Sequence, residues 1–103
     1  REGEIKEIQG GALAAKFRQI MEALGQRKAY NYAEFGIGLN PCSRLCATNL
    51  EDLGRLGNAH CGIGSSYAIG GKVLAPNHID AIFKDAVIEF DGKIVVDKGQ
   101  VRV

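Results

Sequence analysis

The sequence predicts an α+β protein with a mainly antiparallel sheet, one long helix and a short second helix. Three observations support this fold class. Apolar residues recur at helical spacing between Ala12 and Leu24, strand-like runs crowd the last quarter of the chain, and Asp91-Gly92 separates two of those runs as a hairpin turn would. A chain of 103 residues is long enough for one domain, expected to span residues 1–103.

The expected elements follow one another along the chain. A short strand is expected over Glu4–Gln9, followed by the helix over Ala12–Leu24. One strand is expected in YNYAEFGIGLNP, carried by Tyr30, Tyr32 and the run Phe35–Ile37, with Glu34 inside it and Gly38 at its end. Another is expected in the run NAHCGIG, and the segment TNLEDLGRLG between them reads as a short helix with acidic residues in its first turn. The segments HIDAIF, AVIEF, KIVV and VRV complete the sheet, with a second turn at Lys98-Gly99.

Composition and charge argue against several classes of function. Thirteen basic and twelve acidic residues are interspersed and leave a net charge of +1, so no nucleic-acid partner is expected. No apolar run approaches the roughly 20 residues needed to cross a bilayer, so no membrane partner is expected. The three cysteines form an odd set, which fits a reducing compartment, and the expected location is therefore cytoplasmic.

His78 and Asp80 are the first candidates for a metal site. They lie two residues apart on an expected strand, which points both side chains to the same face of the sheet. An imidazole and a carboxylate together suit divalent zinc, cobalt, manganese or iron. The alternative is that a half-buried histidine and an exposed aspartate share a strand face by accident.

Three further residues are candidates with plainer alternatives. His60 lies on a strand that enters a glycine-rich loop, and loops of this kind often carry binding sites. Glu34 is flanked by apolar residues, so it is either the solvent face of an amphipathic strand or a buried carboxylate that needs a partner such as a metal. Tyr67 lies in the glycine-rich loop, where its phenol either packs or donates a hydrogen bond to a developing oxyanion.

Two other kinds of site are not expected. The glycines of GIGSSYAIGG match neither the dinucleotide-binding fingerprint nor the phosphate-binding loop with its lysine. Cys42, Cys46 and Cys61 lack the spacing of a zinc knuckle, and their expected role is that of small buried hydrophobic residues.

Several segments in register resemble the C-terminal part of the aminopeptidase T family, the thermophilic leucyl metalloaminopeptidases. These segments are AEFGIGLNP, AHCGIG with a tyrosine seven residues after its histidine, APNHID and FDGKIVVDKG, and they extend from about Asn31 to Gly99. The resemblance implies a hydrolase, an aminopeptidase of the metallopeptidase class, which uses zinc or cobalt to release the N-terminal residue of a peptide substrate. A dimer or another homo-oligomer is also expected.

The resemblance assigns a role to each candidate residue by its position in these segments. Glu34 corresponds to a metal-bridging carboxylate, and Tyr67 to the group that stabilises the transition state. The further metal ligands are His60, His78 and Asp80.

The same resemblance implies that the site is incomplete. The family's site uses another glutamate from an upstream region that is absent here, so the chain is expected to be a C-terminal fragment of a longer protein and inactive, or nearly so, alone. Whether the chain is an enzyme is therefore left open.

Two alternatives to the peptidase are kept. Relatives of this fold resemble mononuclear iron dioxygenases of hydroxylated pyridines, which use two histidines and one carboxylate, a set that His60, His78 and Asp80 could supply. The other alternative is a non-enzymatic domain that associates with itself through exposed strand edges.

Overall fold

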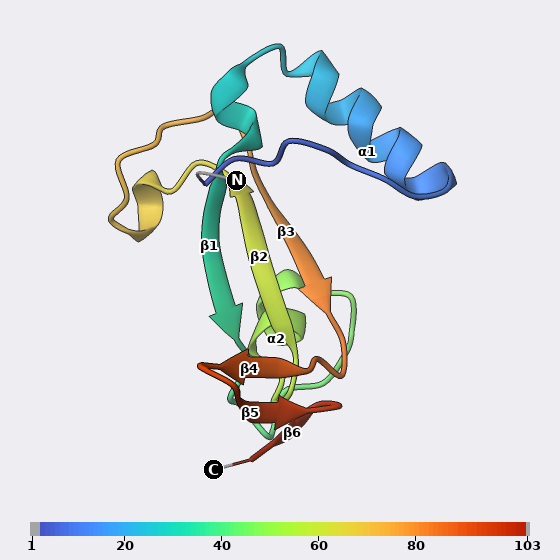
Figure 1. Ribbon diagram of the computed structural model, residues 1–103, viewed down its shortest axis with the longest axis vertical. Helices are drawn as coiled ribbons and strands as arrows, with labels where there is room; N and C mark the ends of the chain where they lie inside the picture. Colours follow the sequence, from blue (N-terminus) through green and yellow to red (C-terminus); the bar gives the residue numbers. More distant parts are fainter. Residues whose placement is uncertain (1–2, 103) are drawn as a thin grey trace. The chain divides into compact units, whose positions relative to one another are not determined.

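The protein is described by a computed structural model over residues 3–102, which divide into two compact units. The first unit holds residues 3–34 and 62–80, and the second holds residues 35–61 and 81–102. The predicted α+β class is confirmed, because helices α1 (Ala12–Ala23) and α2 (Asn49–Gly54) accompany two three-stranded sheets (Figure 1). Within the described residues, no helix has both the length and the apolar character that a membrane crossing needs.

The first sheet has the strand order β1-β2-β3, and neighbouring strands run in opposite directions (Figure 1). The strands are β1 (Tyr32–Ile37), β2 (Ala59–Gly64) and β3 (His78–Phe83). Each strand passes from one unit to the other, with the divisions after Glu34, before Gly62 and after Asp80. The central strand is the most buried, and only His60 of its residues is partly exposed. Strands were predicted in all three places.

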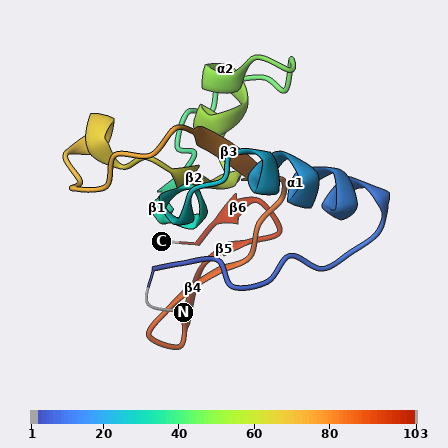
Figure 2. The same cartoon turned by 90° about the horizontal axis from the view of Figure 1, so that it is seen from above.

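In the first unit, the chain that precedes α1 folds back along the helix. Figures 1 and 2 show this segment running outward beside α1 and the helix returning in the opposite direction. Among the described residues, it pairs through an isolated bridge between Glu4 and Asn31 and through two backbone hydrogen bonds, from the Ile5 N–H to the Tyr30 carbonyl and from the Tyr32 N–H to the Gly3 carbonyl. The strand predicted over Glu4–Gln9 is therefore wrong, because the neighbouring segment η1 (Arg27–Tyr30) is a 3-10 helix and gives it no strand to pair with.

The long helix lies where the apolar spacing predicts it. Gly25 follows it in the left-handed region at φ +61°, and its N–H donates to the Glu22 carbonyl, which satisfies one of the last carbonyls of the helix. Met21 is fully buried, whereas 85% of Leu13 is exposed. The first unit thus covers only part of the apolar face that defines the helix in the sequence.

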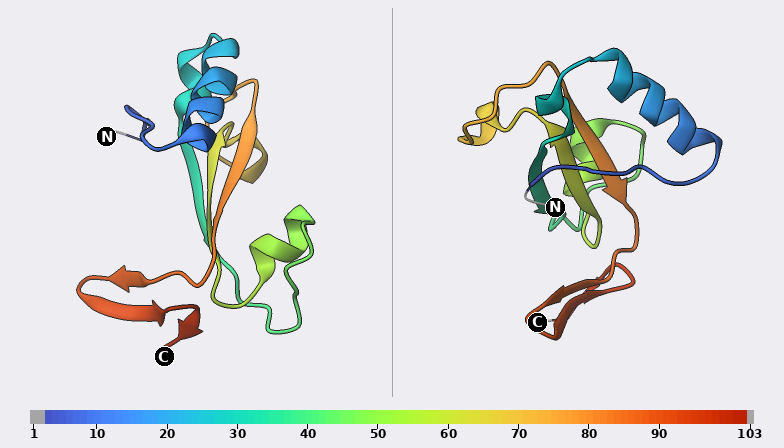
Figure 3. Two further views of the ribbon diagram at one scale, coloured as in Figure 1. Left: turned by 90° about the vertical axis from the view of Figure 1, so that its right-hand side faces the viewer. Right: turned by 45° about the horizontal axis from the view of Figure 1, so that its top comes forward.

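In the second unit, three short strands form the second sheet, in the order β4-β5-β6 (Figure 3). They are β4 (Ile88–Phe90), β5 (Lys93–Asp97) and β6 (Gln100–Val101), and both pairings are antiparallel. The two predicted turns are confirmed. Asp91 and Gly92 have φ values of 49° and 81°, and Lys98 and Gly99 have 47° and 78°, the left-handed pairs that two-residue hairpins require.

The core of the second unit is small and aliphatic. Ala59, Ile88 and Val96 are buried together, and partly buried hydrophobic residues pack around them: Ile37, Ala86, Val95 and Val101. Val96 lies opposite both Ile88 and Val101 in the strand register, which explains why these three side chains meet.

The helix α2 confirms the short helix predicted between the first two strands of the chain. Asn58, which is fully buried, donates from Nδ2 to the Asp52 carbonyl of this helix at 2.9 Å. The loop before α2 exposes Cys42 and Cys46, so the burial predicted for these thiols is wrong, and only Cys61 on β2 is buried. The polar backbone of that loop is held instead by helix side chains, as in the bond from the Cys46 N–H to Asp52 Oδ1.

Alanine substitutions at two glycines of the second unit allow the cost of backbone strain to be measured apart from the cost of steric overlap. Gly57 and Gly92 have nearly equal φ values of +86° and +81°, but a Cβ at Gly57 would overlap the Gly99 carbonyl, whereas a Cβ at Gly92 would meet nothing within 4 Å. Gly92→Ala should lower the free energy of unfolding by about 1–2 kcal/mol through strain alone. Gly57→Ala should lower the free energy of unfolding by a further ~1–3 kcal/mol, because the new methyl group would overlap the Gly99 carbonyl. Urea unfolding monitored by circular dichroism measures both, and equal losses would contradict the described packing.

Candidate metal site

Three side chains of the first unit bring potential metal ligands together. Glu34 comes from β1, and His78 and Asp80 come from β3. One ligand atom from each lies within 4.8 Å of the other two. His78 Nε2 lies 3.2 Å from Asp80 Oδ1 and 3.7 Å from Glu34 Oε2, so the imidazole faces both carboxylates.

The sheet explains why these side chains share one place. His78 and Asp80 are two residues apart on β3, and alternation along a strand points both to the same face. Between β1 and β3 lies Gly62 of β2, where a Cβ would stand 2.6 Å from Glu34 Cγ and 2.8 Å from the His78 ring. The glutamate and the imidazole therefore meet over a position that has no side chain. Sequence reasoning considered this glycine only for phosphate binding.

The orientation of the His78 ring is set by a backbone carbonyl. Its Nδ1 lies 2.6 Å from the Ser65 carbonyl oxygen. Because a carbonyl oxygen can only accept, Nδ1 must carry the proton and donate it, which leaves Nε2 directed at the carboxylates. Histidine ligands of metals are commonly held in this way through their second nitrogen. The contact has no sequence signature, because any residue at position 65 supplies the same carbonyl.

The electrostatics of the cluster favour a positive charge at its centre. Only 20% of the Glu34 side chain and 9% of the Asp80 side chain are exposed, and two such carboxylates repel each other unless a cation lies between them. The hydrogen bond to the Ser65 carbonyl raises the pKa of His78; burial opposes the rise, and the charges of Asp80 and Glu34 add to it. A proton on His78 or a divalent cation can supply the missing charge.

The donor set fits a divalent metal. One imidazole nitrogen and two carboxylate oxygens suit iron, manganese, zinc or cobalt, and the gap above Gly62 gives these groups room to converge. Glu34, His78 and Asp80 were all predicted as ligands. The structure brings these three together, and their role as ligands stays a prediction.

The fourth predicted ligand, His60, belongs to the second unit. Its ring lies over Gly36 of β1, so closely that a Cβ on that glycine would overlap it. Gly36 and Gly62 thus serve in the same way, each leaving space for a histidine ring. The role of His60 as a ligand stays a prediction.

Tyr67, predicted to stabilise the transition state, starts the 3-10 helix η2 (Tyr67–Ile69) in the loop between β2 and β3. It is 67% exposed, and its backbone N–H donates to Ser65 Oγ at 3.4 Å. In the described part of the chain, no hydrogen bond joins its hydroxyl to Glu34, His78 or Asp80. Its catalytic role stays a prediction.

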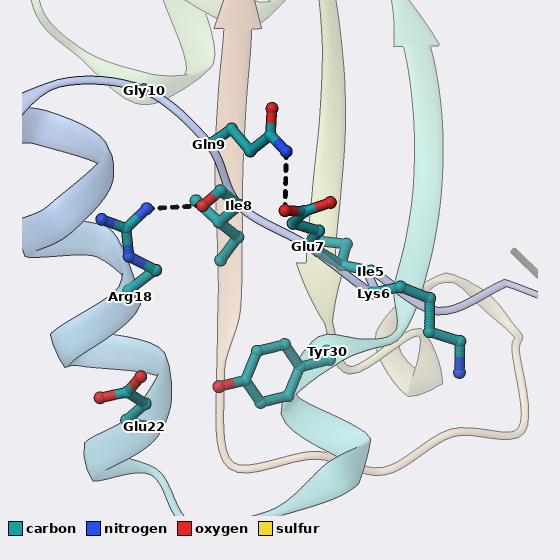
Figure 4. Close-up of a pocket in the computed structure, with 9 residues that line it drawn as sticks. All are labelled: Ile5, Lys6, Glu7, Ile8, Gln9, Gly10, Arg18, Glu22 and Tyr30. Carbon is teal, nitrogen blue, oxygen red and sulfur yellow. Dashed lines mark hydrogen bonds between the residues drawn. The ribbon is translucent and has the colours of Figure 1, made fainter.

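A pocket of about 530 Å³ lies elsewhere in the first unit, between the extended N-terminal segment, α1 and Tyr30 (Figure 4). Several of its polar groups are already engaged. Arg18 donates to the Ile8 carbonyl and Gln9 donates to Glu7, as the dashed lines of Figure 4 show. The cluster around His78, which joins an imidazole to two carboxylates, is therefore the better candidate for chemistry.

Comparison with known proteins identifies the family. Residues 1–103 match the family model NicX, described as 2,5-dihydroxypyridine 5,6-dioxygenase. The chain belongs to the NicX family. A 2,5-dihydroxypyridine 5,6-dioxygenase of Pseudomonas putida KT2440 is 30% identical over an alignment of 108 positions, which covers 96% of this chain and 31% of that protein.

A solved structure gives the same relationship in three dimensions. The 2,5-dihydroxypyridine dioxygenase from Pseudomonas putida KT2440 matches with a TM-score of 0.86 and 28% sequence identity, over 99% of this chain and 32% of that structure. The chain thus spans about a third of the length of the NicX relatives that it matches.

Membership of the NicX family corrects the function inferred from sequence. The resemblance to aminopeptidase T is wrong, and so are the hydrolase, aminopeptidase and metallopeptidase classes that it implied. The iron dioxygenase alternative agrees better with the family. The physical reason for the error is that the matching segments carry candidate metal ligands and their glycine neighbours, and such residues indicate a metal site without specifying the reaction. A divalent metal in general is consistent with a dioxygenase family, and zinc or cobalt has no support from it.

The raised pKa of His78 can be measured in the metal-free protein by an NMR titration. We expect a value above the ordinary 6.5, and a partial fall in Asp80→Asn, since the Ser65 carbonyl, the larger cause, remains. Because the folded protein binds this proton more tightly than the unfolded chain, the stabilisation is fully present below about pH 6.5 and is lost as the pH rises through the folded pKa. A value at or below 6.5 would show that the described contacts do not form.

Proposed function

We propose that this chain carries the metal-binding part of an iron-dependent dioxygenase that acts on a hydroxylated pyridine ring. The observation that carries the proposal is the convergence of Glu34, His78 and Asp80 in a chain of the NicX family. The ring substrate comes from the names of the relatives, which are 2,5-dihydroxypyridine dioxygenases.

The chemistry of the donor set supports iron for this reaction. Two histidines and one carboxylate leave coordination positions of ferrous iron open, which is the arrangement of non-haem iron oxygenases. The cluster offers one imidazole and two carboxylates, and His60 is the predicted second histidine. When bound, ferrous iron would supply the activation of dioxygen that the protein's own side chains lack. Glu34 and Asp80 would balance the charge of the ion, and His78 would present Nε2.

The groups around the cluster would have different roles. The Ser65 carbonyl holds the His78 ring from behind, so the imidazole needs little rearrangement to receive a cation. Asp80 is the most buried of the three side chains, so its carboxylate is the least solvated. In the dioxygenase alternative drawn from the sequence, His60 is the second histidine, and Glu34 then adds a carboxylate to that set.

A substitution at Gly62 tests the site without removing a ligand. Gly62→Ala places a methyl group 2.6 Å from Glu34 Cγ and 2.8 Å from the His78 ring, and the backbone there is not left-handed, so the effect is steric. Ferrous iron affinity, measured anaerobically by calorimetry, should fall by about 10–100-fold. Gly54→Ala is the matched control, because its Cβ would meet only Ser43 Oγ at 3.6 Å. An unchanged affinity in a folded Gly62→Ala protein would place the metal elsewhere.

Oxygen consumption tests the reaction itself. With ferrous iron and 2,5-dihydroxypyridine, the protein should consume dioxygen in an oxygen electrode, and consumption should require both additions. His78→Ala should abolish it, because the iron loses a ligand, and unsubstituted pyridine should not support it. Failure of the wild-type protein to bind iron would refute the proposed function. Iron binding without oxygen consumption would support the metal site and contradict the dioxygenase assignment for this chain.

A further inference from the structure

The residue before His78 makes an unusual set of contacts. Asn77 donates from Nδ2 to two backbone carbonyls, that of Ile63 at 3.1 Å and that of Ala29 at 3.3 Å. Ile63 lies near the end of β2 and Ala29 lies in η1, and both residues are buried. Because both partners are carbonyls, the nitrogen of the amide and not its oxygen must face them. One side chain thus ties the start of β3 to two other segments of the first unit.

The backbone of Asn77 extends this connection to the group that orients His78. The Asn77 carbonyl accepts a hydrogen bond from the Ser65 N–H at 2.7 Å, and the carbonyl of the same Ser65 accepts the His78 Nδ1–H at 2.6 Å. The chain at Gly64 leaves room for this arrangement, since a Cβ there would overlap the Asn77 carbonyl and lie 2.7 Å from Nδ2. Gly64 also has φ +117°, a value that disfavours any other residue.

These hydrogen bonds connect Asn77, Ser65 and His78 to one another. Asn77 holds β2 through its side chain, Ser65 follows β2 and pairs with the Asn77 backbone, and Ser65 in turn holds the ring of the residue after Asn77. Displacement of Asn77 would therefore move both ends of the hydrogen bond between His78 and Ser65.

We propose that Asn77 is a positioning residue for the metal site. It acts by keeping His78 Nδ1 and the Ser65 carbonyl oxygen within hydrogen-bonding distance of each other. Its effect on metal binding rests on the proposed function, whereas its effect on the ring does not. Asn77 touches neither carboxylate of the cluster through any described hydrogen bond, so its influence on the metal passes through His78.

The primary test observes the ring in the metal-free protein. In wild type, the His78 Nδ1–H proton should exchange slowly with water, as seen in NMR spectra of the ¹⁵N-labelled protein, because it is bonded to Ser65. In Asn77→Ala its exchange should accelerate by about two- to tenfold, the effect of losing an ordinary amide hydrogen bond. Unchanged exchange in a folded variant would overturn the proposal.

Asn58→Ala is the matched control. Asn58 is also an asparagine whose Nδ2 donates to a backbone carbonyl, that of Asp52, and it lies in the second unit. Its loss should lower stability, but it should leave the exchange of the His78 proton unchanged. Equal acceleration in both variants would mean that general loosening, and not positioning, controls the ring.

Metal binding gives the second readout. Ferrous iron affinity should fall by about 10–100-fold in Asn77→Ala and stay unchanged in Asn58→Ala, as expected for a residue that orients a ligand. If wild type binds no iron, the proposed function fails, and the exchange measurement still decides the role of Asn77. Equal iron affinity in the two variants would overturn the proposed effect on the site.

Asn77→Ala can also unfold the first unit, which circular dichroism would reveal. Asn77→Ser then replaces it, because a serine side chain is smaller and polar but too short to reach both carbonyls. The wild-type protein provides a test that needs no variant: the side-chain N–H protons of Asn77 should exchange slowly with water. Exchange at the rate of a free amide would overturn the proposal.

Discussion

The candidate site depends on the absence of a side chain at Gly62. Strands β1 and β3 are not neighbours, because β2 lies between them, so their backbones are separated by two strand spacings, or roughly 10 Å. Glu34 and His78 come within 3.7 Å of each other only by reaching over the middle strand. Any Cβ at that point would occupy the space through which they reach. A glycine in the most buried strand therefore determines whether a three-residue cluster exists.

The charges of the cluster also favour a cation: Glu34 and Asp80 are negative, and the imidazole of His78 can carry a proton or face a metal ion. Two carboxylates with little exposure would be unfavourable neighbours by themselves, and the imidazole between them is held by a carbonyl that favours its protonated or cation-bound state. The same arrangement therefore suits a proton on His78 in the metal-free protein and would suit a divalent ion in its place. This exchange is the basis of competition between acid and metal at such sites, because protonation of His78 removes the lone pair that binds metal.

Much of the fold followed from local patterns. The helix after Ala12 and the hairpin turn at Asp91-Gly92 depend on periodicity and on left-handed turn residues, which act over short distances and leave clear signals. The strand predicted over Glu4–Gln9 failed because a strand needs a partner, and the facing segment is a 3-10 helix. Burial of Cys42 failed for a similar reason, because the composition of a loop does not say whether another element covers it.

The site was predictable as a set of residues but not as a mechanism. Alternation along PNHID places His78 and Asp80 on one face, and resemblance supplied Glu34. The contributions of Gly62, Asn77 and the Ser65 carbonyl require knowledge of which strands are neighbours, which no single sequence shows. The reaction class was wrongly inferred because the same ligand types serve zinc and cobalt hydrolases as well as iron oxygenases.

The bond between the Ser65 N–H and the Asn77 carbonyl closes the base of the loop that carries Tyr67. The carbonyl that orients the His78 imidazole belongs to Ser65, at this closure, and Ser65 Oγ also donates to the Val73 carbonyl within the loop. Doubling the length of a flexible loop costs only about 0.6 kcal/mol in closure entropy. A longer loop would therefore cost little stability, and its residues would change the surface beside the candidate site.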